Sequence, residues 1–177
     1  MHLVGDSIMV GSRRRVEAAL RGWDATFDAV VGRSTAGGLA AVEPLGSRLG
    51  DAAVIELGTN DRTRVGFARR ARRLLERIHD TPLVVWVTVH GPAPVPPVNG
   101  MIRTLASRFP NTEVADWDAA VPADGLQEDG IHPNHLGKLV VANLLERVLD
   151  PWRAAVRGHG DRRCEHTVRS IAQDALR

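Results

Sequence analysis

The chain has 177 residues, of which 44% are hydrophobic and 25% are charged, a length and composition typical of one globular domain. The formal net charge is only +2, so the charge balance does not indicate a nucleic-acid-binding surface. The single cysteine, Cys164, excludes an internal disulfide framework and a cysteine-rich metal site.

No apolar run approaches the roughly 20 residues of a membrane-spanning helix, and no charged and apolar leader precedes Gly5. We therefore expect no membrane span and, for the chain as given, a cytoplasmic location. A domain excised from a longer secreted or membrane protein looks the same in sequence, and its location would be extracytoplasmic. Arginine clusters at residues 13–15, 69–73 and 162–163 lack interleaved aromatic residues, so we interpret them as solvated helix faces and expect no specific nucleic-acid partner.

Short apolar segments alternate with amphipathic segments along most of the chain. The first apolar segment, Met1–Val4, predicts a strand that leads into a helix with apolar residues on one face. The expected strands cover residues 1–4, 25–31, 52–57, 83–89 and 112–115. The expected helices cover residues 8–20, 36–49, 63–79, 98–109 and 133–149. The proline-rich segment 91–97 and the polar segment 118–130 are expected to be loops.

This alternation of strands and helices predicts a parallel sheet with helices on both faces. In such sheets, functional sites gather beyond the carboxyl ends of the strands. We therefore expect Ser7, Gly32, Asn60 and the segment Asp129–His132 to converge at that edge.

The character of the sequence changes at Asp150-Pro151. The segment Arg157–Gly160 has the composition of a linker, and residues 161–176 carry apolar side chains at helical spacing. We therefore divide the chain into a domain of residues 1–150 and a basic, helical extension of residues 151–177.

A serine stands where the first strand is expected to turn into a helix. At such a turn the Ser7 hydroxyl stands clear of the sheet edge, and its backbone N–H faces outward at a helix start, where a developing anion is favoured. Gly5 lets the backbone bend there without a Cβ clash. Taken alone, such a serine is more often a helix N-cap than a nucleophile, and the distant residues described next reverse that preference.

The second candidate segment is Asp129–His132, in a loop that enters the last helix. An aspartate three residues before a histidine can hold one ring nitrogen and stabilise the imidazolium, while the other ring nitrogen faces a nucleophile. The alternative is that His132, directly before Pro133, is only a helix-entry residue. His135 is a competing base, but it lacks an acidic residue at a similar spacing.

Asn60 and Gly32 complete the candidate site. Asn60 lies in Gly58–Asp61 after a buried strand, and its side-chain amide can donate a hydrogen bond to an oxyanion. A plain turn is the alternative, because Gly, Asn and Asp are common turn residues. Gly32 follows the second strand in the same position, and its N–H can approach a substrate closely because it has no side chain. Gly37 and Gly38 lie nearby and are alternatives to Gly32.

In this order and at these strand ends, the four segments resemble the SGNH (GDSL-type) hydrolase superfamily over about residues 1–149. The similar blocks are the nucleophile block at Gly5-Asp6-Ser7, the glycine block at Gly32, the asparagine block at Gly58–Asp61 and the Asp-x-x-His block at Asp129–His132. Residues 31–33, 111–117 and 129–133 are further similar to the SGNH domains of bacterial cell-surface O-acetyltransferases.

The resemblance implies a flavodoxin-like three-layer α/β/α fold with a five-stranded parallel sheet. It also implies serine ester chemistry that needs no metal and no cofactor. Ser7 is the implied nucleophile, His132 the implied base and Asp129 its orienting acid. The implied oxyanion hole consists of the N–H groups of Ser7 and Gly32 and the amide of Asn60.

We expect a serine esterase that hydrolyses small acyl esters, above all acetyl esters, of a sugar or related metabolite through an acyl-serine intermediate. One alternative is an O-acyltransferase that moves an acetyl group to a carbohydrate hydroxyl with the same residues. The other is a non-catalytic binding module. Arg33, Arg62 and His90 lie near the expected mouth of the site and are candidates for substrate binding, with ordinary surface arginines and a structural histidine as the alternatives.

Overall fold

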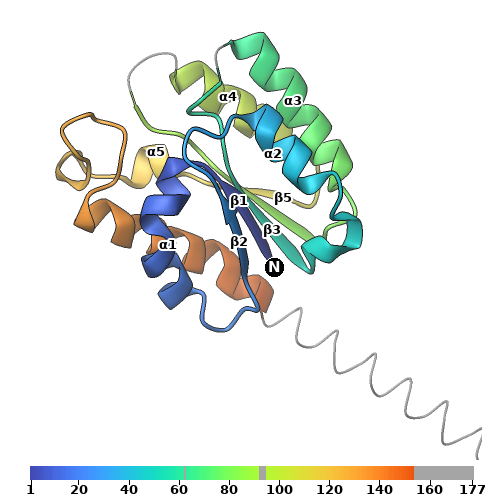
Figure 1. Ribbon diagram of the computed structural model, residues 1–177, viewed down its shortest axis with the longest axis horizontal. Coiled ribbons are helices and arrows are strands. Elements are labelled where there is room, and N and C mark those ends of the chain that lie inside the picture. The colour runs from blue at the N-terminus through green and yellow to red at the C-terminus, as the bar shows by residue number, and fades with distance from the viewer. Residues whose placement is uncertain (62, 92–94, 154–177) are drawn as a thin grey trace, which may run out of the picture.

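The computed structural model describes residues 1–61, 63–91 and 95–153, and within these residues five strands form one parallel sheet (Figure 1). The strands are β1 (His2–Gly5), β2 (Thr26–Ala29), β3 (Ala52–Glu56), β4 (Leu83–Val87) and β5 (Thr112–Ala115). They are hydrogen-bonded in the order β2-β1-β3-β4-β5, and each pairing is parallel. This is the flavodoxin-like strand order, so the expected five-stranded parallel sheet is confirmed.

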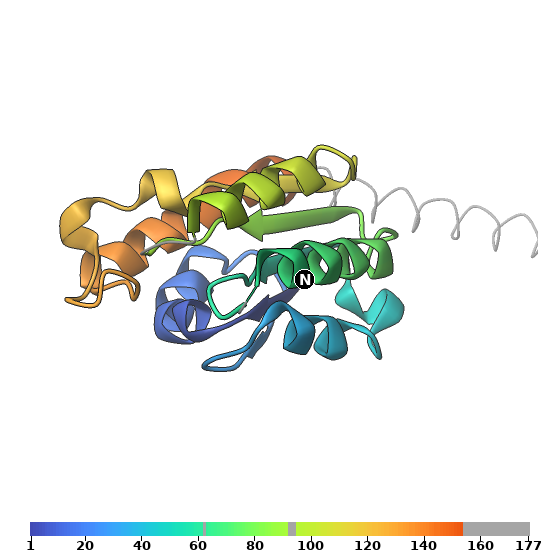
Figure 2. The same ribbon diagram turned by 90° about the horizontal axis from the view of Figure 1, so that it is seen from above.

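Helices cover both faces of the sheet. The helices are α1 (Ser7–Ala19), α2 (Thr35–Val42), α3 (Arg64–Arg77), α4 (Val95–Ala106), α5 (Trp117–Ala120) and a C-terminal helix described over residues 135–153. Figure 1 shows α1 and the C-terminal helix on one side of the sheet and α2 and α3 on the other. Figure 2 shows α2, α3 and α4 following one another on that second side, where α3 contacts both of its neighbours. The molecule therefore has the expected three layers.

Alternate side chains of each strand enter two separate hydrophobic cores. Leu3 and Val54 pack with α1 and the C-terminal helix, whereas Val4 and Ile55 pack with α2, α3 and α4. A strand that is buried on both faces has apolar residues at nearly every position, which is why residues 83–89 are recognisable from sequence.

The helix expected over residues 36–49 is interrupted. The α2 helix ends at Val42, and a short 3-10 helix, Gly46–Leu49, follows after a turn. Pro44 explains the break, because it lacks the backbone N–H that would continue the hydrogen bonds of the helix.

The helix expected over residues 98–109 begins earlier, at Val95, inside the segment 91–97 that we expected to be a loop. Pro96 and Pro97 lie in its first turn. Proline is tolerated there because the first N–H groups of a helix have no partner within the helix.

The C-terminal helix begins at residue 135 and not at Pro133. Pro133 pairs with Leu126 in an isolated bridge, and Asn134 Oδ1 caps the helix by accepting the Leu136 N–H at 2.9 Å. The expected loop 118–130 also contains some regular structure, because α5 extends into it and the 3-10 helix Ala123–Gly125 lies within it.

Of the expected extension 151–177, only residues 151–153 belong to the described residues, where they continue the C-terminal helix. The expected linker and amphipathic helix lie outside the described residues and stay predictions. Among the helices that are described, none is both long enough and apolar enough to cross a membrane.

Candidate active site

Ser7 is the first residue of α1, directly beyond the carboxyl end of β1. Gly5 ends that strand, and a Cβ added to it would lie 2.4 Å from the Met9 Cβ, so the close approach of helix and strand requires glycine. Asp6 is the N-cap of α1, since its Oδ1 accepts the Ile8 N–H at 2.9 Å. The capping role considered for Ser7 therefore belongs to Asp6.

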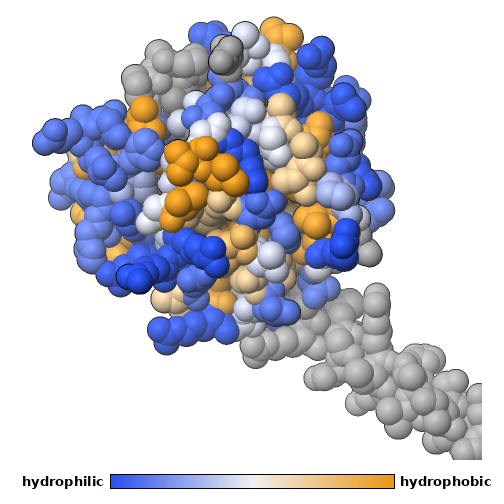
Figure 3. All heavy atoms as spheres, in the orientation of Figure 1, coloured by the Kyte–Doolittle hydropathy of each residue, from blue (hydrophilic) through white to orange (hydrophobic). Residues whose placement is uncertain are grey.

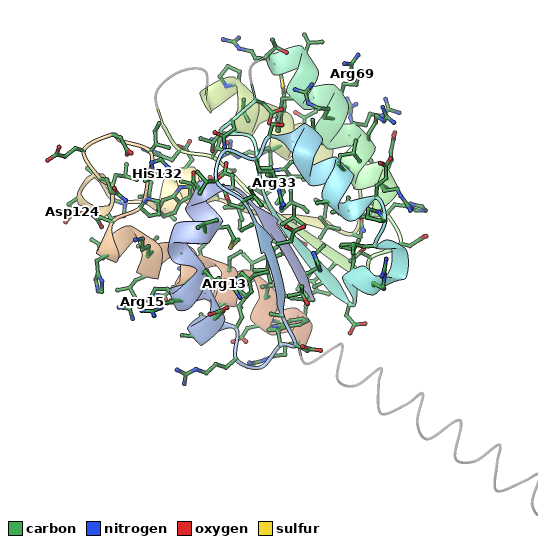
Figure 4. All side chains as sticks on the ribbon, in the orientation of Figure 1. Arg13, Arg15, Arg33, Arg69, Asp124 and His132 are labelled. Carbon is green, nitrogen blue, oxygen red and sulfur yellow. The ribbon has the colours of Figure 1, made fainter. Side chains whose placement is uncertain are left out.

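The structure brings Ser7, His132 and Asp129 into one hydrogen-bonded row. His132 Nε2 lies 3.0 Å from Ser7 Oγ, although 125 positions separate the two residues in the chain. His132 Nδ1 lies 2.6 Å from Asp129 Oδ2. Because an ionised carboxylate accepts a proton from Nδ1, Nε2 is left to accept the proton of the Ser7 hydroxyl. Figure 4 shows His132 reaching from its loop toward the start of α1.

Asp129 is held in its ionised form by hydrogen bonds. Its Oδ1 accepts the backbone N–H groups of Ile131 and His132, each at 2.9 Å. The His132 backbone N–H, the His132 ring and the Ile131 N–H together lower the pKa of the Asp129 carboxyl from 3.8 to about 2. The His132 ring therefore faces a negative charge at any ordinary assay pH.

The backbone N–H groups at the start of α1 differ in whether they have a hydrogen-bond partner. The N–H groups of Asp6 and Met9 both donate to Glu56 Oε2, at 3.1 and 3.3 Å, and the Ile8 N–H donates to Asp6. Within the part of the chain that the structure describes, no group accepts the Ser7 N–H. This N–H is therefore available to an oxyanion that forms beside Ser7 Oγ.

The loop after β2 presents Gly32 in the left-handed conformation, with a φ of +75°. No heavy atom lies within 4 Å of the position of a Cβ there, and among the described residues its N–H has no hydrogen-bond partner. The Val30 N–H donates to the Gly5 carbonyl at 3.1 Å, and the Arg33 carbonyl accepts from Asn60 at 3.3 Å. The loop of Gly32 is thus tied to the turn before Ser7 and to Asn60.

Asn60 follows β3, and its side-chain amide is already engaged. Its Nδ2 donates to Asp6 Oδ2 at 2.8 Å and to the Arg33 carbonyl at 3.3 Å. The amide carries two N–H groups, so both have partners here. To donate to an oxyanion, Asn60 has to release or share its longer bond, the one to Arg33.

Glu56, the last residue of β3, is 1% exposed and was not among the residues predicted for the site. Burial, followed by the negative charge of Asp6, raises the pKa of the Glu56 carboxyl well above 4.5. Burial also raises the pKa of Asp6. The available signal was an acidic residue inside an otherwise apolar strand.

Two of the three candidate substrate-binding residues are arginines, Arg33 and Arg62. Arg33 Nη2 lies 2.6 Å from Asp28 Oδ1, and the guanidinium also donates to the Asp28 carbonyl. A role of Arg33 in substrate binding stays a prediction. Arg62 lies outside the described residues. The sequence could not show the ion pair of Arg33, because it forms across a loop.

His90 lies just beyond β4 and has an acidic partner that sequence analysis missed. Its Nδ1 is 2.7 Å from Asp118 Oδ1, and Asp118 Oδ2 accepts from Asn99 at 3.0 Å. The His90 side chain is 30% exposed, so a role in substrate binding stays a prediction.

The alternatives to the main candidates lie elsewhere. His135 is exposed on the C-terminal helix and contacts Arg15 at 3.4 Å, and Gly37 and Gly38 lie inside α2. Over residues 1–61, 63–91 and 95–153, no group of three or more His, Cys, Asp or Glu side chains is arranged to hold a metal ion.

The sequence also matches a known protein family. Residues 3–139 match the GDSL-like lipase/acylhydrolase family. No curated protein matches the sequence.

Several solved structures share the fold at low sequence identity. The catalytic domain of the peptidoglycan O-acetyltransferase OatA from Streptococcus pneumoniae is 18% identical, with a TM-score of 0.74 over 85% of this chain and 92% of that one. A member of the lipolytic protein G-D-S-L family from Veillonella parvula is 20% identical, with a TM-score of 0.72 over 84% and 97%. A carbohydrate esterase family 3 protein from Talaromyces cellulolyticus is 18% identical, with a TM-score of 0.68 over 87% and 97%.

Replacing Asp129→Asn should lower kcat for ester substrates by about 10⁴-fold with little change in KM, because an amide N–H facing Nδ1 favours the wrong tautomer of His132. The matched control is Asp124→Asn in the same loop, since Figure 4 shows Asp124 away from His132. Steady-state kinetics of both variants measure kcat and KM. A kcat of the Asp129 variant within threefold of the wild type would remove this residue from the reaction.

Replacing Asn60→Ala should lower kcat by about 10²–10³-fold, because one oxyanion donor is lost while the N–H groups of Ser7 and Gly32 remain. Asn143→Ala, at an exposed position of the C-terminal helix, is the control. If kcat falls only as much as in the control, Asn60 serves the loop structure and not the oxyanion.

Proposed function

The chain belongs to the GDSL-like lipase/acylhydrolase family, which makes it a serine esterase or acyltransferase, and we propose that it hydrolyses small acyl esters, acetyl esters above all, of a sugar or related metabolite. The observation that carries the proposal is the hydrogen bond of 3.0 Å between Ser7 Oγ and His132 Nε2, with His132 Nδ1 on Asp129. This is the arrangement of a serine nucleophile with its base and orienting acid.

In the proposed reaction, Ser7 Oγ attacks the ester carbonyl and His132 Nε2 takes the hydroxyl proton. The negative charge of Asp129 stabilises the imidazolium that forms. The tetrahedral oxyanion accepts hydrogen bonds from the N–H groups of Ser7 and Gly32 and from the Asn60 amide.

His132 then gives its proton to the leaving alcohol, and the carbon–oxygen bond of the ester breaks to leave an acyl-Ser7 intermediate. Water, deprotonated by His132, attacks this intermediate and releases the acid and free Ser7. A bound sugar hydroxyl in place of water would complete an acyl transfer.

The surface beside Ser7 suits a substrate with an apolar part. Val30 and Val31, directly before Gly32, are 51% and 70% exposed, and Val10 of α1 is 40% exposed. Figure 3 shows hydrophobic atoms gathered over the region of α1 and β2, with hydrophilic atoms around them. Such a surface fits an acyl methyl group or the carbon face of a sugar ring.

The choice of an acetyl ester of a carbohydrate draws support from the similar structures. One is the domain of a peptidoglycan O-acetyltransferase and another is a carbohydrate esterase. The His132 side chain is 38% exposed, so both water and an acceptor hydroxyl can reach it. Acyl transfer is therefore the alternative reaction, and experiments have to distinguish it from hydrolysis.

Replacing Ser7→Ala should lower turnover of p-nitrophenyl acetate and of acetylated sugars by roughly 10⁴–10⁶-fold, because the nucleophile is lost. Ser107→Ala is the matched control, since that hydroxyl donates only to the Thr104 carbonyl on the surface. A panel of esters that varies acyl length and alcohol locates the preferred substrate. Retention of most activity in the Ser7 variant, or failure of wild-type Ser7 to react with a fluorophosphonate, would favour the binding module.

Incubation of an acetylated substrate with and without a carbohydrate acceptor should give the same yield of free acetate, because water completes the proposed reaction. Product analysis by mass spectrometry measures both acetate and acetylated acceptor. Acceptor acetylation at the expense of acetate would make the protein an O-acyltransferase.

A further inference from the structure

Two carboxyl groups lie buried directly beneath the nucleophile turn. Glu56, at the end of β3, stands opposite Gly5 in the sheet register, and Asp6 follows Gly5. Glu56 is 1% exposed and Asp6 is 0% exposed. Among the described residues, neither carboxyl forms an ion pair with a lysine, an arginine or a histidine. Two adjacent carboxylates cannot both stay ionised in such a place, so one of them holds a proton.

The hydrogen bonds indicate which carboxyl holds it. Both backbone donors of Glu56, the N–H groups of Asp6 and Met9, bind the same oxygen, Oε2. Asp6 instead has one donor on each oxygen, the Ile8 N–H on Oδ1 and the Asn60 amide on Oδ2. The Glu56 Oε1 is thus the oxygen left to carry a proton, and the Asp6 carboxylate is its hydrogen-bond partner.

Other charges near the pair act on Asp6. His132, from the loop before the C-terminal helix, favours the ionised form of Asp6, whereas Glu56 is affected by the charge of Asp6 alone. The neighbouring segments β1, α1 and the loop after β3 contribute backbone N–H groups and the Asn60 amide. Burial is the first cause that raises the pKa of Glu56, and the charge of Asp6 is the second.

We propose that protonated Glu56 is a positioning residue for the reaction of Ser7. Its Oε1–H donates to the Asp6 carboxylate, and its Oε2 binds the N–H groups of Asp6 and Met9. With the Ile8 N–H on Asp6, the carboxyl pair binds the N–H groups of Asp6, Ile8 and Met9 and leaves the Ser7 N–H for substrate. This inference rests on the proposed function of Ser7.

A proton on Glu56 makes the stability of the fold depend on pH. A carboxyl whose pKa is higher in the folded than in the unfolded protein stabilises the fold fully below the unfolded pKa, and that stabilisation is lost as the pH rises through the folded pKa. For Glu56 the loss lies on the alkaline side of 4.5. Loss of the proton there sets two negative charges against each other beneath Ser7.

Two substitutions at Glu56 distinguish a need for its proton from a need for a negative charge at this position. Glu56→Gln keeps a carbonyl for the two N–H groups and an N–H for Asp6 at every pH. Glu56→Leu removes both functions and keeps similar bulk. Glu113→Gln, at an exposed glutamate of β5, is the matched control.

We expect Glu56→Leu to lower kcat for p-nitrophenyl acetate about 10²-fold at unchanged KM, because misplacement of the reacting groups costs rate. Glu56→Gln should lower kcat by only about threefold. Its melting temperature and kcat should also lose the alkaline decline that the wild type and the Glu113 variant show.

Either of two results would overturn the proposal. One is a Glu56→Gln variant that loses as much kcat as Glu56→Leu, since the charge would then be needed. The other is a Glu56→Gln variant whose melting temperature declines with pH as in the wild type. The melting curves need no activity, so they test Glu56 even if Ser7→Ala shows that the proposed function is wrong. If Glu56→Leu does not fold, the comparison of Glu56→Gln with the wild type still decides.

Discussion

The contact between the start of α1 and the end of β3 is the constraint on which the candidate site depends. A Cβ on Gly5 would lie 3.2 Å from Glu56 Oε2, so the helix start reaches this carboxyl only because Gly5 has no side chain. The approach lets the buried carboxyls satisfy helix N–H groups that would otherwise need water. Ser7 is therefore held at the sheet edge, with its hydroxyl toward His132.

Three carboxyl groups near Ser7 have two different environments. Asp129 lies in an exposed loop and accepts three hydrogen bonds, which lower its pKa to about 2. Asp6 and Glu56 are buried, and burial raises the pKa of both. Environments that separate carboxyl pKa values in this way are typical of catalytic sites. Asp129 thus keeps a negative charge beside the His132 ring, whereas Asp6 and Glu56 beneath α1 share a proton.

Residues that act through local geometry were predictable. Apolar residues at nearly every position of 83–89 indicate a strand buried on both faces, and that strand is β4. Asp129 and His132 lie three positions apart, so one loop places them together. The ends of helices near prolines were predicted less well, because a helix tolerates proline in its first turn but not farther along. The ion pair of Arg33 with Asp28 was not predicted, because it depends on the conformation of a loop.

The sequence by itself determined the layers of the fold, the strand ends that carry polar residues, and the residue types available for ester chemistry. These follow from periodicity and short-range spacing, which the chain carries without its partners. Only the tertiary structure decided that Asp6 and not Ser7 caps α1, that the Asn60 amide already has hydrogen-bond partners, and that Glu56 lies beneath the turn that carries Ser7. The last two depend on the pairing of β1 with β3, which brings together groups about 50 positions apart. Hydrogen bonds at that separation leave no periodic trace in the sequence.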